Sequence, residues 1–476
     1  MKNSLLAATA LAVAVFACTR LAQTTAPSGD PPIKNCFCAD STRCNDLCSS
    51  LPIDVLEKFN PGYSGALTPT FQPPFDIFSW QTFIALNWPS DARGAPLNCP
   101  LNEHPNAPRV WERYVDAAAL FQHGDAPLLL AIDEAAAKGQ KFFYRFSKSP
   151  HPLNNGIAPG RTFDDEDEEA DGHALIDRNL NFALFEIRVN PDEADFIRNN
   201  HLGTLPGIDT YYRAHKDSFS LPASAFPSTA GAMEIKASWR ILDPALGDDT
   251  TRYYTRDAII QVPKQNSATG QAFQVKAKVG LVGMHIIRKT GNFAFLIWST
   301  FEHIDNTPDD VQAAQTNQDA RRWSFYNVEC LTCPVDSPPV LAASDSGHYK
   351  WNPTPPYAAR YATGVPGEQG GKVFGTQVTR TYPIYYRTQQ VNQLWQTKLG
   401  GTIWANYRLV GTQWTVPNDG GTSNTINVPF RLGNTTLETY IQENASCIQC
   451  HGFAGVIAGK DTISTDFSFI FGMAKK

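Results

Sequence analysis

Along much of the chain, hydrophobic and polar residues alternate with the period of two that a half-buried β-strand requires. The alternation is clearest in residues 233–242 and 253–262. Shorter segments with the same character predict strands at residues 182–189, 402–413 and 426–432. Strands are therefore expected to dominate the centre of the chain.

Two long apolar segments, residues 276–289 and 293–303, stand next to each other in the sequence. Thr290 and Gly291 lie between them, and a short polar pair with glycine is typical of a tight hairpin turn. The sequence therefore predicts an antiparallel hairpin that turns at Thr290-Gly291.

Helical signals are fewer and lie toward the two ends. Residues 75–88 predict a buried aromatic helix, residues 127–140 a helix that begins with proline, and residues 392–399 a third helix. Asn434 precedes Thr435-Thr436-Leu437-Glu438, a capping-box pattern that predicts a helix running into the segment that follows. The expected fold is α+β and mainly β: a large, irregular antiparallel-sheet body with helices near both ends.

The composition agrees with many short elements, because 11% of the residues are aromatic and the chain has 34 prolines and 33 glycines. A net charge of -6 and a pI near 5.9 give no basic field for a phosphate backbone, so nucleic acid is excluded as an expected partner. Residues 164–171 form an acidic run, interpreted as a solvated loop, with calcium binding as the alternative.

The first residues resemble an export signal. Residues 1–26 combine a basic start with a short apolar run, which predicts a secretory signal peptide; the alternative is a lipoprotein signal with Cys18 as a lipid anchor. No later segment is long and apolar enough to predict a transmembrane helix. The expected location is the periplasm, the cell envelope or the exterior. Three regions would follow: a Cys-rich segment at 27–50, an aromatic-rich body at 51–370 and a C-terminal region at 371–476.

The cysteines agree with an oxidising compartment. Four of them, within residues 36–48, are close enough for two local disulfides, and Cys330 and Cys333 form another close pair. Without Cys18 and the cysteines of the 447–451 motif described next, seven remain, so one is free or pairs with Cys18.

Cys447-Ile448-Gln449-Cys450-His451 has the C-x-x-C-H spacing of covalent haem c attachment. Each thiol adds across one haem vinyl group, and the imidazole that follows ligates the iron from the same side. The alternative is a redox or structural C-x-x-C pair followed by histidine by chance. Because the chain is expected to be exported, and c-type haem is attached outside the cytoplasm, haem attachment is favoured over this alternative. The motif predicts one covalent haem c in region 371–476, carried by the C-terminal helix, with His451 as the proximal iron ligand.

Two residues are candidates for the distal iron ligand. Met473 is the only methionine after the motif, and a thioether ligand suits an electron carrier. His285 lies in an apolar strand in which Gly280 and Gly283 permit close approach of a flat group. The alternatives are packing for Met473 and a hydrogen-bonded core residue for His285.

His303 is a third histidine to consider. A turn at Thr290-Gly291 pairs His285 with Leu296, which places His303 seven residues further along, about 23 Å at the rise of a strand, and on the opposite face. His285 and His303 are therefore not expected to ligate one iron. Met284 should also face away from His285.

Residues 79–89, 280–289, 298–306 and 435–451 together resemble a family of large exported bacterial mono-haem proteins, the cytochrome c family proteins. The resemblance implies haem binding but no settled reaction. Asp466-Phe467-Ser468-Phe469 is similar to a run after C-x-x-C-H in the β-sheet cytochromes that include the hydroxylamine-oxidising enzymes and cytochrome c-prime-beta. In that group the distal iron face stays open to small nitrogenous ligands.

Three functions fit these observations. The first is an electron-transfer cytochrome whose partner is a redox protein or small molecule. The second is a haem oxidoreductase with an open distal site for peroxide, nitric oxide or a small organic substrate. The third is a binding or sensor protein in which the haem is structural or sensory. Whether the chain is an enzyme is left open by the sequence.

Overall fold

The structure is a computed structural model that describes residues 30–55, 70–121, 126–144, 173–227, 229–293, 295–316, 322–330, 332–339, 349–358, 368–369, 372–417 and 425–475. The predicted signal peptide with Cys18 and the acidic run 164–171 lie outside these residues. Among the helices described, none is long and apolar enough to cross a bilayer.

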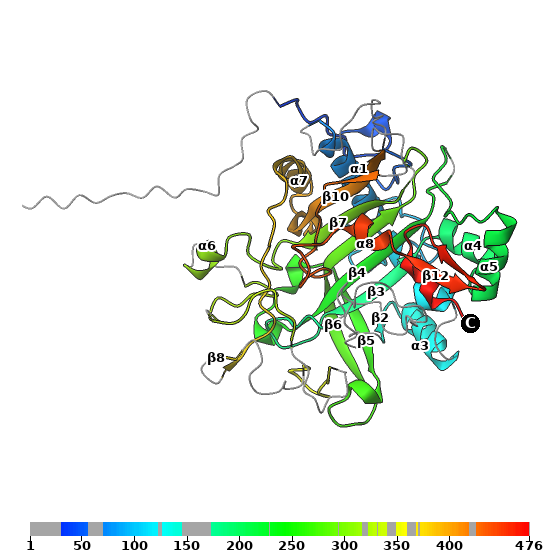
Figure 1. Cartoon of the computed structure of the whole chain (residues 1–476). Coiled ribbons are helices and arrows are strands. Elements are labelled where there is room, and N and C mark those ends of the chain that lie inside the picture. Colours follow the sequence, from blue (N-terminus) through cyan, green and yellow to red (C-terminus); the bar gives the residue numbers. More distant parts are fainter. Residues whose placement is uncertain are drawn as a thin grey trace, which may run out of the picture.

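A mixed sheet of nine strands organises the part of the chain that is described (Figure 1). Its main path is β1-β3-β4-β6-β7-β10-β11, and β5 joins β6 and pairs with the short β2. The bounds are β1 Val115–Asp116, β2 Lys141–Phe143, β3 Leu184–Val189, β4 Met233–Leu242, β5 Thr255–Val262, β6 Phe273–Arg288, β7 Ile297–His303, β10 Tyr407–Pro417 and β11 Thr425–Val428. Two small hairpins stand apart from it: β8 Glu368–Gln369 with β9 Lys372–Val373, and β12 Gly455–Ala458 with β13 Asp461–Ser464.

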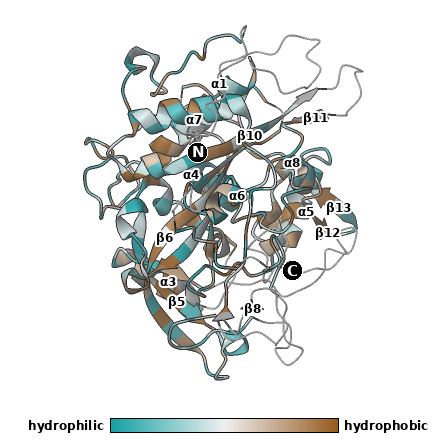
Figure 2. Ribbon diagram, turned by 90° about the vertical axis from the view of Figure 1, so that its left-hand side faces the viewer, coloured by the Kyte–Doolittle hydropathy of each residue, from teal (hydrophilic) through white to brown (hydrophobic). Residues whose placement is uncertain are grey.

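β6 is the central strand of this sheet. Its first half pairs with β5 and its second half with β7, while β4 runs along its other edge. The β5–β6 arm extends away from the body, and its alternating hydrophobic and hydrophilic residues are visible in Figure 2. Since β10 also pairs with β7, regions 51–370 and 371–476 contribute strands to one sheet.

The helices are short, and most lie at the periphery of the sheet. They are α1 Gln72–Leu86, α2 Ala117–Leu120, α3 Ala126–Ala137, α4 Pro191–Asn199, α5 Leu205–Ala214, α6 Val311–Gln315, α7 Tyr386–Lys398 and α8 Cys447–His451. α1 is buried on nearly every side, and prolines occupy its first turn, where they leave no hydrogen bond unmade. The predicted helices at 75–88, 127–140 and 392–399 are therefore confirmed as α1, α3 and α7.

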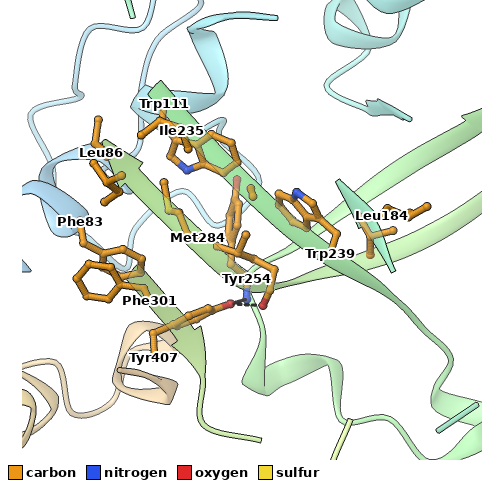
Figure 3. Close-up of a cluster of buried hydrophobic side chains, with 14 of the residues drawn as sticks. Phe83, Leu86, Trp111, Leu184, Ile235, Trp239, Tyr254, Met284, Phe301 and Tyr407 are labelled. Atoms are coloured by element: carbon orange, nitrogen blue, oxygen red, sulfur yellow. Dashed lines mark hydrogen bonds between the residues drawn. The ribbon is translucent and has the colours of Figure 1, made fainter. Parts of the chain in front are cut away.

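The two faces of the sheet bury different partners. Because side chains alternate along a strand, Met284 and Ile286 of β6 face α1 and α7, whereas His285 and Ile287 face the C-terminal segment. The α1 face holds the largest hydrophobic cluster (Figure 3). Within it the Tyr407 hydroxyl accepts from the backbone N–H of Tyr254 (3.0 Å). The same hydroxyl donates to the carbonyl of Leu281 (3.0 Å), so this buried phenol is satisfied both as donor and as acceptor.

Two internal disulfides close the Cys-rich segment, which packs against a helix of the α1 face. Cys36 is bonded to Cys44 and Cys38 to Cys48, while Cys330 is bonded to Cys333. The ring of Phe37 packs edge-on against Trp395 of α7, at a centroid distance of 5.0 Å. Small loops closed in this way stabilise a segment that has little apolar material of its own.

The fold class is as predicted: α+β, mainly β, with helices near both ends and a sheet that is antiparallel except for the β2–β5 pair. The strand predictions for 233–242, 253–262 and 276–289 agree with β4, β5 and β6 within a few residues. β7 and β10 begin four or five residues later than the predicted 293 and 402. Strand β11 ends at Val428, before Pro429, rather than at residue 432.

The hairpin turn prediction is wrong. His285 pairs with Thr300, not Leu296, so a long loop replaces the two-residue turn. The reason is competition from other segments: Ser224 Oγ accepts from the N–H of Gly291 (3.0 Å), and Asp54 Oδ2 accepts from that of Asn292 (2.7 Å). These bonds hold the loop open.

The prediction of a helix from the capping box at Thr435 is also wrong. The segment forms successive turns up to Asn444, and α8 begins only at Cys447. The Asn434 side-chain amide donates to Thr300 Oγ1 (2.9 Å), and the Thr435 hydroxyl donates to Glu302 Oε2 (2.8 Å). These bonds pin the segment to the sheet and prevent it from winding into a helix.

Candidate functional site

The Cys447–His451 motif forms α8, a single short helix that lies over β7 and β10. Gln413 of β10 fixes its start: Oε1 accepts from the backbone N–H of Ile448 (2.9 Å), and Nε2 donates to Ser446 Oγ (3.2 Å). The Gln413 side chain is fully buried, so these bonds have no competition from water. The sheet thus determines where the motif lies.

The ring of His451 is oriented by a backbone hydrogen bond. Its Nδ1–H donates to the carbonyl oxygen of Phe467 (2.8 Å), while the ring packs against Trp298 (5.2 Å between centroids) and Phe469 (4.9 Å). Nε2 has no hydrogen-bond partner in the part of the chain that is described. Burial lowers the pKa of His451 to about 4, so the imidazole is neutral near pH 7 and Nε2 carries a free lone pair.

The carbonyl of Phe467 is itself held in place. Asp466 and Phe467 both have positive φ values, 53° and 69°, which non-glycine residues adopt rarely. The Asp466 carboxylate accepts two bonds from Lys289 Nζ (3.0 and 2.9 Å) and one from the backbone N–H of Leu221 (2.8 Å). The loop after β6 and the residues after α5 thereby fix the turn that orients His451.

No disulfide joins Cys447 and Cys450, although Cys330 and Cys333 at the same spacing are bonded. Cys447 is buried and Cys450 is exposed. Burial raises the pKa of the Cys447 thiol well above its ordinary value, and the charges of Glu438 and Cys450 raise it further. Disulfide exchange needs an accessible thiolate, so the Cys447 thiol is not suited to attack a disulfide.

His285 lies on the same face of the sheet as the motif. Its Nε2 is 3.0 Å from Glu438 Oε1, and its Nδ1 is buried without a partner among the described residues. Burial favours a raised pKa for Glu438, but the charge of His285, their hydrogen bond and the N–H of Asn434 outweigh it and lower that pKa. The charges of His285 and of Lys236, its neighbour on β4, also lower the pKa of His451, so these groups lie near one another.

The close approach that was expected at Gly283 is filled by the protein itself. A Cβ there would lie 2.2 Å from Thr436 Oγ1 and 2.4 Å from Ser238 Oγ. At Gly280, the space is taken by Leu242 and Tyr253. The glycines therefore admit protein side chains, and Gly283 lets the 434–436 turn sit directly on β6.

Met473 and His303 lie elsewhere. Met473 is buried in a cluster with Ile470 and Phe471, apart from the cluster that contains Cys447. His303 stacks on Tyr253 (4.0 Å between centroids) on the opposite face from His285, as predicted. It is three residues beyond the partner of His285, about 10 Å along the strand rather than the predicted 23 Å.

His303 is a satisfied core residue. Its Nε2–H donates to the carbonyl of Arg252 (3.0 Å), and its Nδ1 accepts from the N–H of Asp305 (3.1 Å). Burial lowers its pKa to about 4. Both ring nitrogens are thus occupied, and neither is available as a ligand.

Sequence reasoning missed the groups that orient the motif. Gln413 lies at the end of a predicted strand, where nothing in the sequence pattern marks it as a partner of the motif. The Phe467 carbonyl is a backbone group, which a sequence pattern does not identify. Glu438 was seen only as a capping residue. Its pairing with His285 depends on the β6–β7 register, which the loop after β6 determines.

Searches against protein-family models, curated proteins and solved structures found no match to this chain.

Proposed function

We propose that this chain is an exported c-type cytochrome with one haem attached to Cys447 and Cys450 and ligated by His451, and that it acts in electron transfer. The observation that carries the proposal is the bond from His451 Nδ1–H to the Phe467 carbonyl. Histidines that ligate metals usually donate their other ring N–H in this way, which fixes the tautomer and the direction of the ligating nitrogen.

The residues around the motif fit a large apolar group with polar edges. Phe453, two residues after His451, is 71% exposed, and Phe430 is 62% exposed. Phe430 follows Pro429, whose carbonyl accepts from the same Gln413 Nε2 that contacts Ser446. One exposed ring thus belongs to a segment tied to the start of α8 and the other follows its end, and exposed aromatic side chains beside a motif favour a surface that is covered in the working protein. The Nε1–H of Trp298, whose ring packs on His451, is buried without a partner among the described residues and offers a donor.

The chemistry of attachment needs only the two thiols of the chain and the two vinyl groups of the haem. Each thiol adds its sulfur to one vinyl carbon and its hydrogen to the other, so no atom is lost and no oxidant is required. The bound haem would supply one-electron redox chemistry. The protein's contribution is to hold His451 neutral and oriented and to keep water from its ring.

The attachment test compares two C-x-x-C pairs of one chain. The wild-type chain, expressed with a c-type maturation apparatus, should retain one haem per chain after denaturation, measured as covalent haem on a denaturing gel and by mass. Cys447→Ser with Cys450→Ser should lose it completely, while Cys330→Ser with Cys333→Ser should retain it. A wild-type chain without covalent haem would contradict the proposal.

A second candidate function is a haem oxidoreductase with an open distal site. The His285–Glu438 pair favours it, because a buried histidine held by a carboxylate can accept or release a proton beside a reacting ligand. The spin state decides between the two functions. A low-spin iron that ignores carbon monoxide supports electron transfer, and a high-spin iron that binds it supports the enzyme.

Substitutions then assign the distal residue. If His285 ligates the iron, His285→Ala should convert a low-spin spectrum to a high-spin one, while Met473→Ala leaves it unchanged. The reverse result would assign Met473. If neither variant changes a low-spin spectrum, neither residue is the distal ligand.

A further inference from the structure

Cys99, Glu103 and His104 bring three different donor atoms together, away from the haem motif. Each offers one ligand atom, and the three atoms lie within 4.8 Å of one another. The loop that carries them precedes the short 3-10 helix Val110–Arg113. Leu101, between the donors, packs in the cluster on the α1 face, whereas Cys447 packs on the opposite face. The two sites are therefore separate.

The loop is anchored rather than free. Leu101 is buried, and the indole N–H of Trp88 donates to the carbonyl of Leu97 (3.0 Å). The backbone N–H of Glu103 donates to the carbonyl of Pro100 (3.1 Å), which closes a turn in the chain between Cys99 and His104. His104 has a positive φ of 51°, a conformation that is unusual for a residue with a side chain. The donors are thus presented by a defined backbone.

The state of Cys99 agrees with a ligand role. Cys36, Cys38, Cys44, Cys48, Cys330 and Cys333 are all paired in disulfides. Outside the C-x-x-C-H motif, Cys99 is the one cysteine among the described residues that has no such bond. It is partly buried, while Glu103 and His104 are exposed, so the thiol lies at the base of the cluster and the other donors at its rim.

The donor set determines which metal would bind. A thiolate and a carboxylate supply two negative charges and the imidazole none, which matches a divalent cation. Sulfur and imidazole donors are poor ligands for calcium or magnesium and good ones for zinc. Donors around tetrahedral zinc lie roughly 3.5 Å apart, so the observed spread needs only small side-chain movements. Three protein ligands leave the fourth position to water.

We propose that Cys99, Glu103 and His104 form a zinc site with one open coordination position. The cysteine sulfur, a carboxylate oxygen and a ring nitrogen are the ligands. An exchangeable water completes the tetrahedron. The site does not depend on haem attachment, because it lies on the other face of the sheet.

The test uses the full exported chain, stripped with a chelator and titrated with Zn²⁺ in a calorimeter. We expect one zinc per chain, with zinc-edge absorption showing one sulfur near 2.3 Å and the remaining ligands near 2.0 Å, the usual bond lengths. Cys99→Ser, Glu103→Gln and His104→Ala should each weaken binding at least tenfold.

His201→Ala is the matched control, because His201 is also exposed and has a positive φ of 56°. It should bind zinc as the wild type does. The proposal is overturned if the wild-type chain takes up no zinc, if the three variants bind it with unchanged affinity, or if peptide mapping of the purified chain finds Cys99 in a disulfide. Measurement of bound iron in the same samples keeps the outcome separate from that of the haem proposal.

Discussion

At the scale of single residues, Glu193 and Glu234 form an unusual pair of buried carboxyl groups. Glu193 lies in the first turn of α4, and Glu234 lies opposite Val189 in the sheet. Burial raises the pKa of Glu193 well above its ordinary value, and the charge of Glu234 raises it further. Burial likewise raises the pKa of Glu234 to about 7. At least one of the two is therefore protonated in the folded protein near neutral pH.

This pair makes stability fall as the pH rises. The folded chain holds a proton on Glu234 up to about pH 7, whereas the unfolded chain releases it near 4.5. Between these values the folded state binds more protons, so the free energy of unfolding decreases with increasing pH. Glu234→Gln imitates the protonated form. Its free energy of unfolding should therefore fall less from pH 5 to pH 8 than that of the wild type, by on the order of 2 kcal/mol.

Thermal unfolding at the two pH values measures this difference. Glu443→Gln, at an exposed position, serves as the control and should follow the wild type. Equal losses of stability in the wild type and Glu234→Gln would show that the pair does not titrate in this range.

At the scale of elements, alternation predicted β4 well because its apolar side chains join the cluster on the α1 face, whereas polar ones such as Ser238 face the C-terminal segment. The register between β6 and β7 was harder to predict. It depends on where the loop after β6 is held, and Asp54 and Ser224, far away in sequence, hold it. The capping box failed for a similar reason, since Thr300 and Glu302 bind the side chains of the segment. The motif residues were predictable from spacing, but the groups that orient them come from tertiary structure.

Gly283 shows how closely one strand and one turn can pack. A Cβ at this position would overlap the Thr436 hydroxyl. Gly283→Ala should therefore destabilise the protein by about 1–3 kcal/mol, because the 434–436 turn must move away from β6. Urea unfolding measures the change. Gly203→Ala is the control, with nothing within 4 Å of the added carbon, and should change stability by less than about 0.5 kcal/mol. Similar midpoints for both variants would contradict this packing.

At the scale of the whole molecule, Glu302 joins segments that are distant in sequence. It lies on β7, is fully buried, and contacts both Arg380 and Arg408 of β10. Its other oxygen accepts from the Thr435 hydroxyl (2.8 Å). One carboxylate therefore ties the sheet, the segment before α7 and the C-terminal segment together.

Glu302→Gln should destabilise the protein by about 3 kcal/mol, because two guanidinium groups lose the buried charge that balances them. Asp309 contacts the same two arginines but is 44% exposed, so Asp309→Asn should change stability by less than about 0.5 kcal/mol. Unfolding midpoints of the two variants measure the difference. Equal effects would mean that burial does not set the strength of these ion pairs.

Cys447 lies beneath its neighbours, whereas Cys450 of the same helix is open to solvent. A maturation apparatus cannot reach a thiol that is already buried in one cluster with Trp298 of β7 and Leu432 of the segment before α8. On the proposed function, attachment therefore precedes the closing of the C-terminal segment over the sheet. The buried position of Cys447 then sets the order of assembly: haem attachment comes first, and the C-terminal segment packs over the sheet afterwards.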